Sequence, residues 1–173
     1  MKKLLLILLL SLFLITAGCG DNVLTTTPKP TPDGSFNFIL RYGVTAKNVI
    51  DTYQGKFTKD MIEDPPITID LRLTEEEMDR IYQKMVEIDF FNYPDRFMVN
   101  VPSGQPTHVV TPFNAYQFTV ERDSQIKRLD WDDSIMNPDE KANKLRELID
   151  LIKGIIESRD EYKQLPEPSG GYL

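Results

Sequence analysis

The sequence is poor in the residues that supply thiol, metal and histidine chemistry. Its 173 residues include one cysteine, one histidine and one tryptophan. A single cysteine cannot form an internal disulfide, and one histidine without a free cysteine cannot complete a closed zinc site. Phosphate-binding loops and dinucleotide fingerprints are also missing from the sequence. We therefore predict no metal and no cofactor.

Positive charge is scarce as well. The chain has 20 basic against 27 acidic residues, for a net charge of −7. An acidic protein repels the phosphates of nucleic acids, so nucleic acid is excluded as a partner. Hydrophobic residues make up 40% of the chain, as is typical of a globular protein, and the length suits one domain.

The first residues have the three parts of a secretory signal. Lys2 and Lys3 form a basic start, Leu4 to Ile15 are apolar except for Ser11, and small residues follow. The apolar run is short against the ~20 residues that span a bilayer, which speaks against an uncleaved membrane helix. An ordinary cleaved signal is the other alternative.

The end of this segment carries a more specific motif. Thr16-Ala17-Gly18-Cys19 resembles the lipobox of bacterial lipoproteins, with Thr16 in place of the usual leucine. The resemblance implies cleavage between Gly18 and Cys19 and a diacylglyceryl group on the Cys19 thiol. We therefore expect residues 1–18 to be a lipoprotein signal peptide. The mature protein would be anchored to the cell membrane through Cys19, on its extracytoplasmic face.

Composition divides the remaining chain into three parts. Residues 19–34 combine the lipidated cysteine with a linker rich in threonine and proline, which favours an extended, solvated chain. Residues 165–173 are rich in proline and glycine, and we predict a disordered tail there. The folded domain is therefore expected over residues 35–164.

Alternating apolar side chains predict strands in the domain. Residues 35–42, 48–53 and 67–73 have this pattern, and 57–62 has it weakly. Pro65-Pro66 is expected to break the chain before the third clear strand. Further short strands are predicted at 107–111, 115–121 and 126–131, with the last two joined by a turn at Asp123-Ser124.

Two segments have helical spacing. Thr74 followed by Glu77 is a capping box, and it predicts a helix that ends near Phe90. Asn137 is expected to cap a second helix, with Pro138 at its first position, that runs to about Tyr162. The order of elements predicts an α+β fold: an antiparallel sheet of five to six strands with two helices packed on one face.

Two motifs also suggest a relationship. The helix start Leu73 to Glu77 and the helix end Ile88 to Phe91 resemble those of a class of small secreted bacterial domains of unknown function. The similarity covers most of Phe36 to Ile156. It implies an opening ribbon, a hairpin and a closing helix, and it implies no activity.

Few residues are candidates for chemistry. His108 lies near Ser103, but no nucleophile motif surrounds that serine, which favours an exposed loop histidine. Asp130, Asp132 and Asp133 form the one dense carboxylate cluster. It could hold Ca²⁺, but it lacks the EF-hand pattern, and a solvated turn is favoured instead. Trp131 is expected to anchor the sheet to a helix.

Several aromatic residues could line a binding groove, although a place in the core is favoured for most of them: Tyr42, Tyr53, Tyr93, Phe97 and Tyr116. The leading prediction is a non-enzymatic binding or structural module of the cell envelope, with an unknown envelope protein or the cell wall as its partner. The alternative is a small carboxylate-dependent hydrolase that acts on envelope glycans through a pair such as Asp130 and Asp132.

Overall fold

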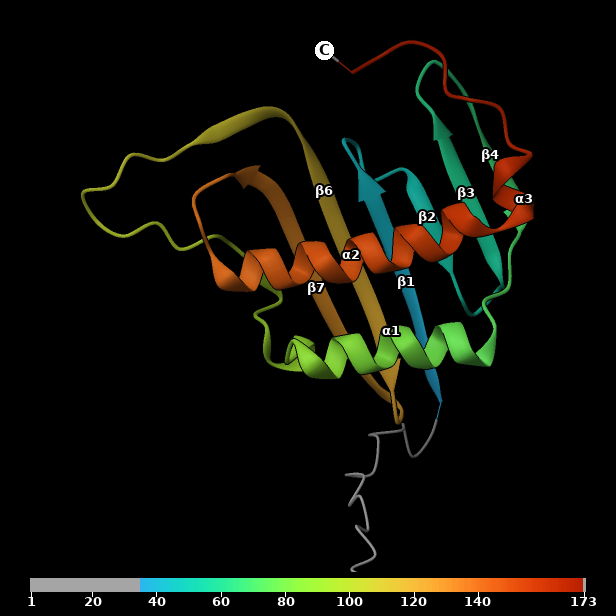
Figure 1. Ribbon diagram of the computed structural model, residues 1–173, viewed down its shortest axis with the longest axis horizontal. Coiled ribbons are helices and arrows are strands. Elements are labelled where there is room, and N and C mark those ends of the chain that lie inside the picture. Colours follow the sequence, from blue (N-terminus) through green and yellow to red (C-terminus); the bar gives the residue numbers. More distant parts are fainter. Residues whose placement is uncertain (1–34, 173) are drawn as a thin grey trace, which may run out of the picture.

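The computed structural model describes residues 35–172, which form a seven-stranded sheet with the helices on one face (Figure 1). The strands are β1 (Phe36–Gly43), β2 (Asn48–Asp51), β3 (Lys56–Met61), β4 (Asp64–Asp70), β5 (Arg96–Phe97), β6 (Val109–Arg122) and β7 (Gln125–Ile135). The helices are α1 (Glu75–Glu87), α2 (Glu140–Ser158) and α3 (Asp160–Lys163), and a 3-10 turn, η1, covers Phe90–Asn92. The strand order is β4-β3-β2-β1-β6-β7-β5.

The predicted fold class is confirmed only in part. The chain does combine one sheet with helices on a single face, but the sheet has seven strands rather than five or six. It is also mixed rather than antiparallel, because β5 and β7 run parallel. The described residues form three helices rather than two. The missed strand β5 has two residues, too few to produce an alternating pattern.

The core lies between the sheet and the helices. Alternate residues of the central strands point toward the helices, and α2 supplies a broad apolar face. The fully buried side chains include Phe38, Leu40, Ile50, Phe57, Met85, Phe118, Leu129, Leu145 and Leu148. Each such side chain contributes about 1.5–3 kcal/mol to folding, so the packed face is strongly specified. Among residues 35–172, no helix covers the opposite face of the sheet (Figure 1).

The start of α1 matches its prediction. The Thr74 hydroxyl accepts a hydrogen bond from the Glu77 backbone N–H at 3.2 Å, and the Glu77 carboxylate accepts one from the Thr74 N–H at 2.8 Å. The capping box is therefore confirmed. The helix ends at Glu87, a few residues before the predicted end near Phe90, and η1 follows.

The predicted cap of α2 is wrong. Asp139, not Asn137, is the N-cap, and its carboxylate accepts a hydrogen bond from the Ala142 N–H at 2.9 Å. Asn137 is buried and binds the long loop before β6: its amide donates to the Pro106 carbonyl at 3.0 Å and accepts from the His108 N–H at 2.8 Å. A carboxylate suits the positive end of the helix better than a neutral amide does.

Two strands continue through prolines where breaks were expected. β4 begins at Asp64 and includes Pro65 and Pro66. β4 is an edge strand, and an edge strand tolerates proline, which has no backbone N–H to donate to a neighbouring strand. β6 runs from Val109 to Arg122 as one strand with an irregularity between Val109 and Asn114, where two short strands were predicted.

The hairpin of β6 and β7 is confirmed. Asp123 and Ser124 form its two-residue turn, both with positive φ, and Arg122 pairs with Gln125. β7 then continues to Ile135, so the acidic cluster lies within a strand. The expected solvated turn at Asp130 to Ser134 is wrong. The strand survives there because its buried side contributes Trp131 to the core.

The segment after α3 has contacts that the sequence does not predict. Residues 165–172, for which a disordered tail is expected, lie against the ends of β3 and β4. The predicted signal peptide and linker, residues 1–34 with Gly18 and Cys19, lie outside the described residues. Within the described range 35–172, no helix is long and apolar enough to cross a membrane.

Candidate functional site

The uncovered face of the sheet presents an ordered array of side chains. Strand register aligns one row across all seven strands, from β4 to β5: Thr68, Thr58, Val49, Arg41, Gln117, Asp130 and Arg96. Side chains alternate between the two faces, so every member of this row points away from the helices. Most of the row is polar, and it contains no aromatic residue. This face is therefore built for polar contacts.

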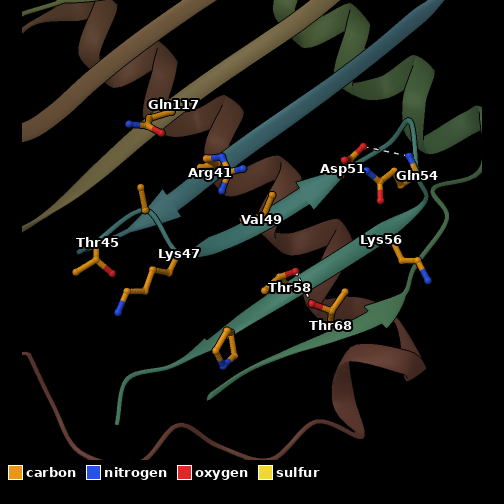
Figure 2. A pocket seen from close by; sticks show the side chains of 12 residues that line it. Arg41, Thr45, Lys47, Val49, Asp51, Gln54, Lys56, Thr58, Thr68 and Gln117 are labelled. Atoms are coloured by element: carbon orange, nitrogen blue, oxygen red, sulfur yellow. Dashed lines mark hydrogen bonds between the residues drawn. The ribbon is translucent and has the colours of Figure 1, made fainter. Parts of the chain in front are cut away.

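A shallow hollow of about 700 Å³ lies on this face. Figure 2 shows its side chains gathered over β1, β2, β3, β4 and β6 and the loop between β1 and β2. Three cations line it, Arg41, Lys47 and Lys56, against one carboxylate, Asp51. Basic residues thus outnumber acidic ones here, whereas the chain as a whole has a net charge of −7.

Some polar groups of the hollow already have partners. The Lys56 ammonium binds the Asp70 carboxylate at 2.7 Å, and this hydrogen bond lowers the pKa of Asp70. The Asp51 carboxylate accepts a hydrogen bond from the Gln54 N–H at 3.1 Å. The hydroxyls of Thr58 and Thr68, side by side in Figure 2, lie 2.8 Å apart.

Arg41 and Lys47 differ from these groups. Within residues 35–172 neither side chain has an ion pair or a hydrogen bond, and both are exposed. A guanidinium group offers a planar fork of donors that fits a carboxylate or a phosphate, and an ammonium group adds a point charge. The arrangement can therefore bind an oxyanion without first breaking an internal ion pair.

The sequence does not single out Arg41 and Lys47. Alternation in residues 35–42 places Arg41 on the polar side of its strand, which is the only available signal. Lys47 lies in a loop, and the local sequence does not predict which residues surround that loop in the folded protein. Their proximity depends on β1, β2 and the β1–β2 loop folding onto one face.

The acidic cluster is divided between the two faces of the sheet. Asp130 and Asp132 are exposed and belong to the uncovered face, whereas Asp133 points toward the helices and is buried. The Asp133 carboxylate accepts two hydrogen bonds from Arg146, at 3.0 Å from Nε and 2.6 Å from Nη2. This contact raises the pKa of Arg146. The three carboxylates therefore do not converge on one point.

No group of three or more metal-binding side chains occurs among the described residues. Asp130 and Asp132 do line a second hollow of about 490 Å³, together with Arg96 and Gln117. They project from same-side positions of one strand, whereas a glycosidase pair flanks the bond that it cleaves. The hydrolase alternative stays a prediction.

His108 is exposed in the loop before β6, as predicted, and so is Ser103. Of the five aromatic candidates for a groove, only Tyr53 is exposed, at 43% of its surface. The other four are buried, which confirms the core interpretation for Tyr42, Tyr93, Phe97 and Tyr116. Trp131 is also buried, with ring centroids 5.5 Å from Phe97 and 5.4 Å from Tyr116, on the side of the sheet that faces the helices.

Comparisons with protein-family models, with curated proteins and with solved structures found no match to this chain. Its site must therefore be interpreted from the geometry. The fold and the site define a one-sided sheet protein with a polar, solvent-facing surface and a basic hollow on that surface.

Proposed function

We propose that the protein is a lipid-anchored, extracytoplasmic binding module of the cell envelope, and that the hollow on its uncovered sheet face holds an anionic polymer. The observation that carries the proposal is the pair of exposed cations, Arg41 and Lys47, without partners among the described residues. Carboxylate or phosphate groups along an extended chain have the charge that complements them.

The overall negative charge does not oppose this assignment. At physiological salt the Debye length is about 8 Å, so carboxylates farther than that from the hollow are largely screened. The carboxylate that lines the hollow and the one beside Lys56 are engaged: Asp51 accepts the Gln54 N–H, and Asp70 pairs with Lys56. A polymer in the hollow therefore interacts mainly with the local excess of positive charge.

Binding of defined polymers to the full-length chain in mild detergent tests the site. The probes are labelled linear polyphosphate, poly-L-glutamate and neutral dextran. We expect saturable binding of an anionic probe, no binding of dextran, and weaker binding as salt increases. The ratio of the polyphosphate and polyglutamate affinities identifies the preferred anion. Absence of binding by both anionic probes would contradict the proposal.

A matched substitution separates the hollow from net charge. Arg41→Gln should weaken binding about fivefold, as expected for loss of one exposed charged contact worth about 1 kcal/mol. Arg128→Gln removes the same charge from an exposed arginine of the same face, on β7 and outside the hollow. We expect it to leave affinity nearly unchanged. An equal loss in both variants would mean that binding follows net charge and has no defined site.

The anchor is tested separately. Two acyl chains hold a protein stably at a bilayer, whereas one holds it only marginally. Cys19→Ala should therefore release the protein from membranes or leave it as an uncleaved precursor. If the variant remains membrane-bound and mature in size, as the wild type would be, the lipid anchor is ruled out.

A further inference from the structure

Residues 165–172 run from the end of α3 back to the loop that borders the hollow. The Lys59 ammonium donates to the Pro166 carbonyl at 2.8 Å, and Ser169 forms a parallel bridge with Ile62. The Ser169 hydroxyl donates to the Asp64 carboxylate at 2.6 Å. The segment therefore crosses the ends of β3 and β4 with several polar contacts.

Two contacts of this segment satisfy buried charges on β3. Lys59 and Asp60 are only 5% and 7% exposed. Lys59 reaches the Pro166 carbonyl and lies 5.0 Å from the centre of the Tyr162 ring. Asp60 accepts a hydrogen bond from the Tyr172 hydroxyl. Asp60 also accepts a hydrogen bond from the Ile62 N–H at 3.1 Å. Because each lost partner of a buried charge is costly, both side chains favour the bound position of the segment.

The far end of the segment touches the binding hollow. The Tyr172 hydroxyl lies 3.2 Å from the Thr45 hydroxyl, in addition to its contact with Asp60. Thr45 and Lys47 belong to the same short loop between β1 and β2, and both line the hollow. Tyr172 therefore joins a buried carboxylate of β3 to the loop that carries Lys47, a cation of the hollow without a partner among residues 35–172.

The path of the segment requires a glycine. Gly170 has φ +78°, and a Cβ atom there would lie 2.3 Å from the Glu63 carboxylate oxygen. Substitution by alanine would strain the backbone of the segment at this positive φ and force the exposed Glu63 side chain to move, without removing a hydrogen-bonding side chain of the segment.

We propose that residues 165–172 form a strap that positions the β1–β2 loop, and that Tyr172 is thereby a positioning residue of the anion site. The expected effect of the strap on affinity rests on the proposed function. The effect of the strap on the mobility of the loop can be measured without any ligand. The strap holds the loop that carries Lys47 because Tyr172 and Asn48 constrain this loop from two sides. Asn48 donates to the Tyr42 carbonyl at 3.3 Å and accepts from the Asp60 N–H at 3.0 Å.

The test uses the full-length chain with Tyr172→Phe, which keeps the ring and removes the hydroxyl. Amide hydrogen exchange in residues 44–47 should become about tenfold faster, as loss of one hydrogen bond predicts. Affinity for linear polyphosphate should fall about threefold. Gly170→Ala should reproduce both changes. Tyr53→Phe is the control, because it removes the hydroxyl of an exposed tyrosine outside the loop and outside the hollow.

The outcomes distinguish the strap from the proposed anion-binding function. Unchanged exchange in residues 44–47 of Tyr172→Phe would overturn the strap. Faster exchange with unchanged affinity would overturn the positioning role of Tyr172. If the wild type binds no anionic polymer, the proposed function fails, and the exchange measurement alone still decides whether the strap exists. A general loss of stability would accelerate exchange throughout the sheet and would also overturn the specific role.

Discussion

Arg146→Met should destabilise the protein strongly, because it isolates a buried carboxylate. Asp133 is 8% exposed and receives both of its charged hydrogen bonds from Arg146. Breaking such a pair from one side typically costs 3–5 kcal/mol. The Arg146 side chain is 27% exposed, so water can reach the vacated position and the lower end applies. We expect a loss of about 3 kcal/mol, or about 10 °C in melting temperature for a chain of this size.

Urea unfolding measures this loss directly. Trp131 is the only tryptophan, is buried, and lies 5.3 Å from the Arg146 guanidinium, so its fluorescence reports unfolding at the site. The double variant Asp133→Leu with Arg146→Met should return to within about 1 kcal/mol of the wild type, since an apolar pair replaces the ion pair. A loss below about 1 kcal/mol in Arg146→Met, or a double variant as unstable as the single one, would refute the reasoning.

Three further predictions concern pH and metal. Burial raises the pKa of Tyr93 and Tyr116 to about 12, above the unfolded value near 10. Stability should therefore fall as pH rises from about 10 to about 12, with phenolate absorbance appearing together with unfolding. The hydrogen bond from Lys127 lowers the pKa of Asp95 below its unfolded value near 3.9. This stabilisation is present above that value and is lost as pH falls further, so Lys127→Met should restore an ordinary Asp95 pKa in an NMR titration. Calorimetry in ~0.15 M salt should detect no saturable Ca²⁺ site; a dissociation constant below ~10⁻⁵ M that Asp132→Asn abolishes would contradict this.

Local patterns predicted the elements that depend on local chemistry. The capping box at Thr74 and Glu77 fixed the start of α1 because both hydrogen bonds join residues three apart. The alternation in residues 35–42 predicted β1, and the turn at Asp123-Ser124 predicted the hairpin. In each case the residues that interact are neighbours in the sequence.

The errors arose where distant residues decide the outcome. Asn137 looks like a helix cap by its position, but its amide is used by Pro106 and His108 of the preceding loop. The acidic cluster looks like a turn, yet pairing with β6 keeps it in a strand. Arg41 and Lys47, which have no partner within residues 35–172, were missed for the same reason, since they line one hollow only after the sheet and its loops have folded.

The position of the hollow also bears on the proposed anchor. β1 starts at Phe36 and leads to the loop that carries Thr45 and Lys47 at its other end (Figure 1). Eight residues of extended strand cover about 27 Å. If the chain is tethered through Cys19, the strand carries the basic loop away from the end of the domain that the linker enters. Lys47 would then lie at the end of the hollow farther from the membrane, where lipid headgroups would compete less with a polymer of the envelope. Shortening the linker should therefore leave polymer affinity unchanged on vesicles, whereas a site that faces the bilayer would lose affinity as the linker shortens.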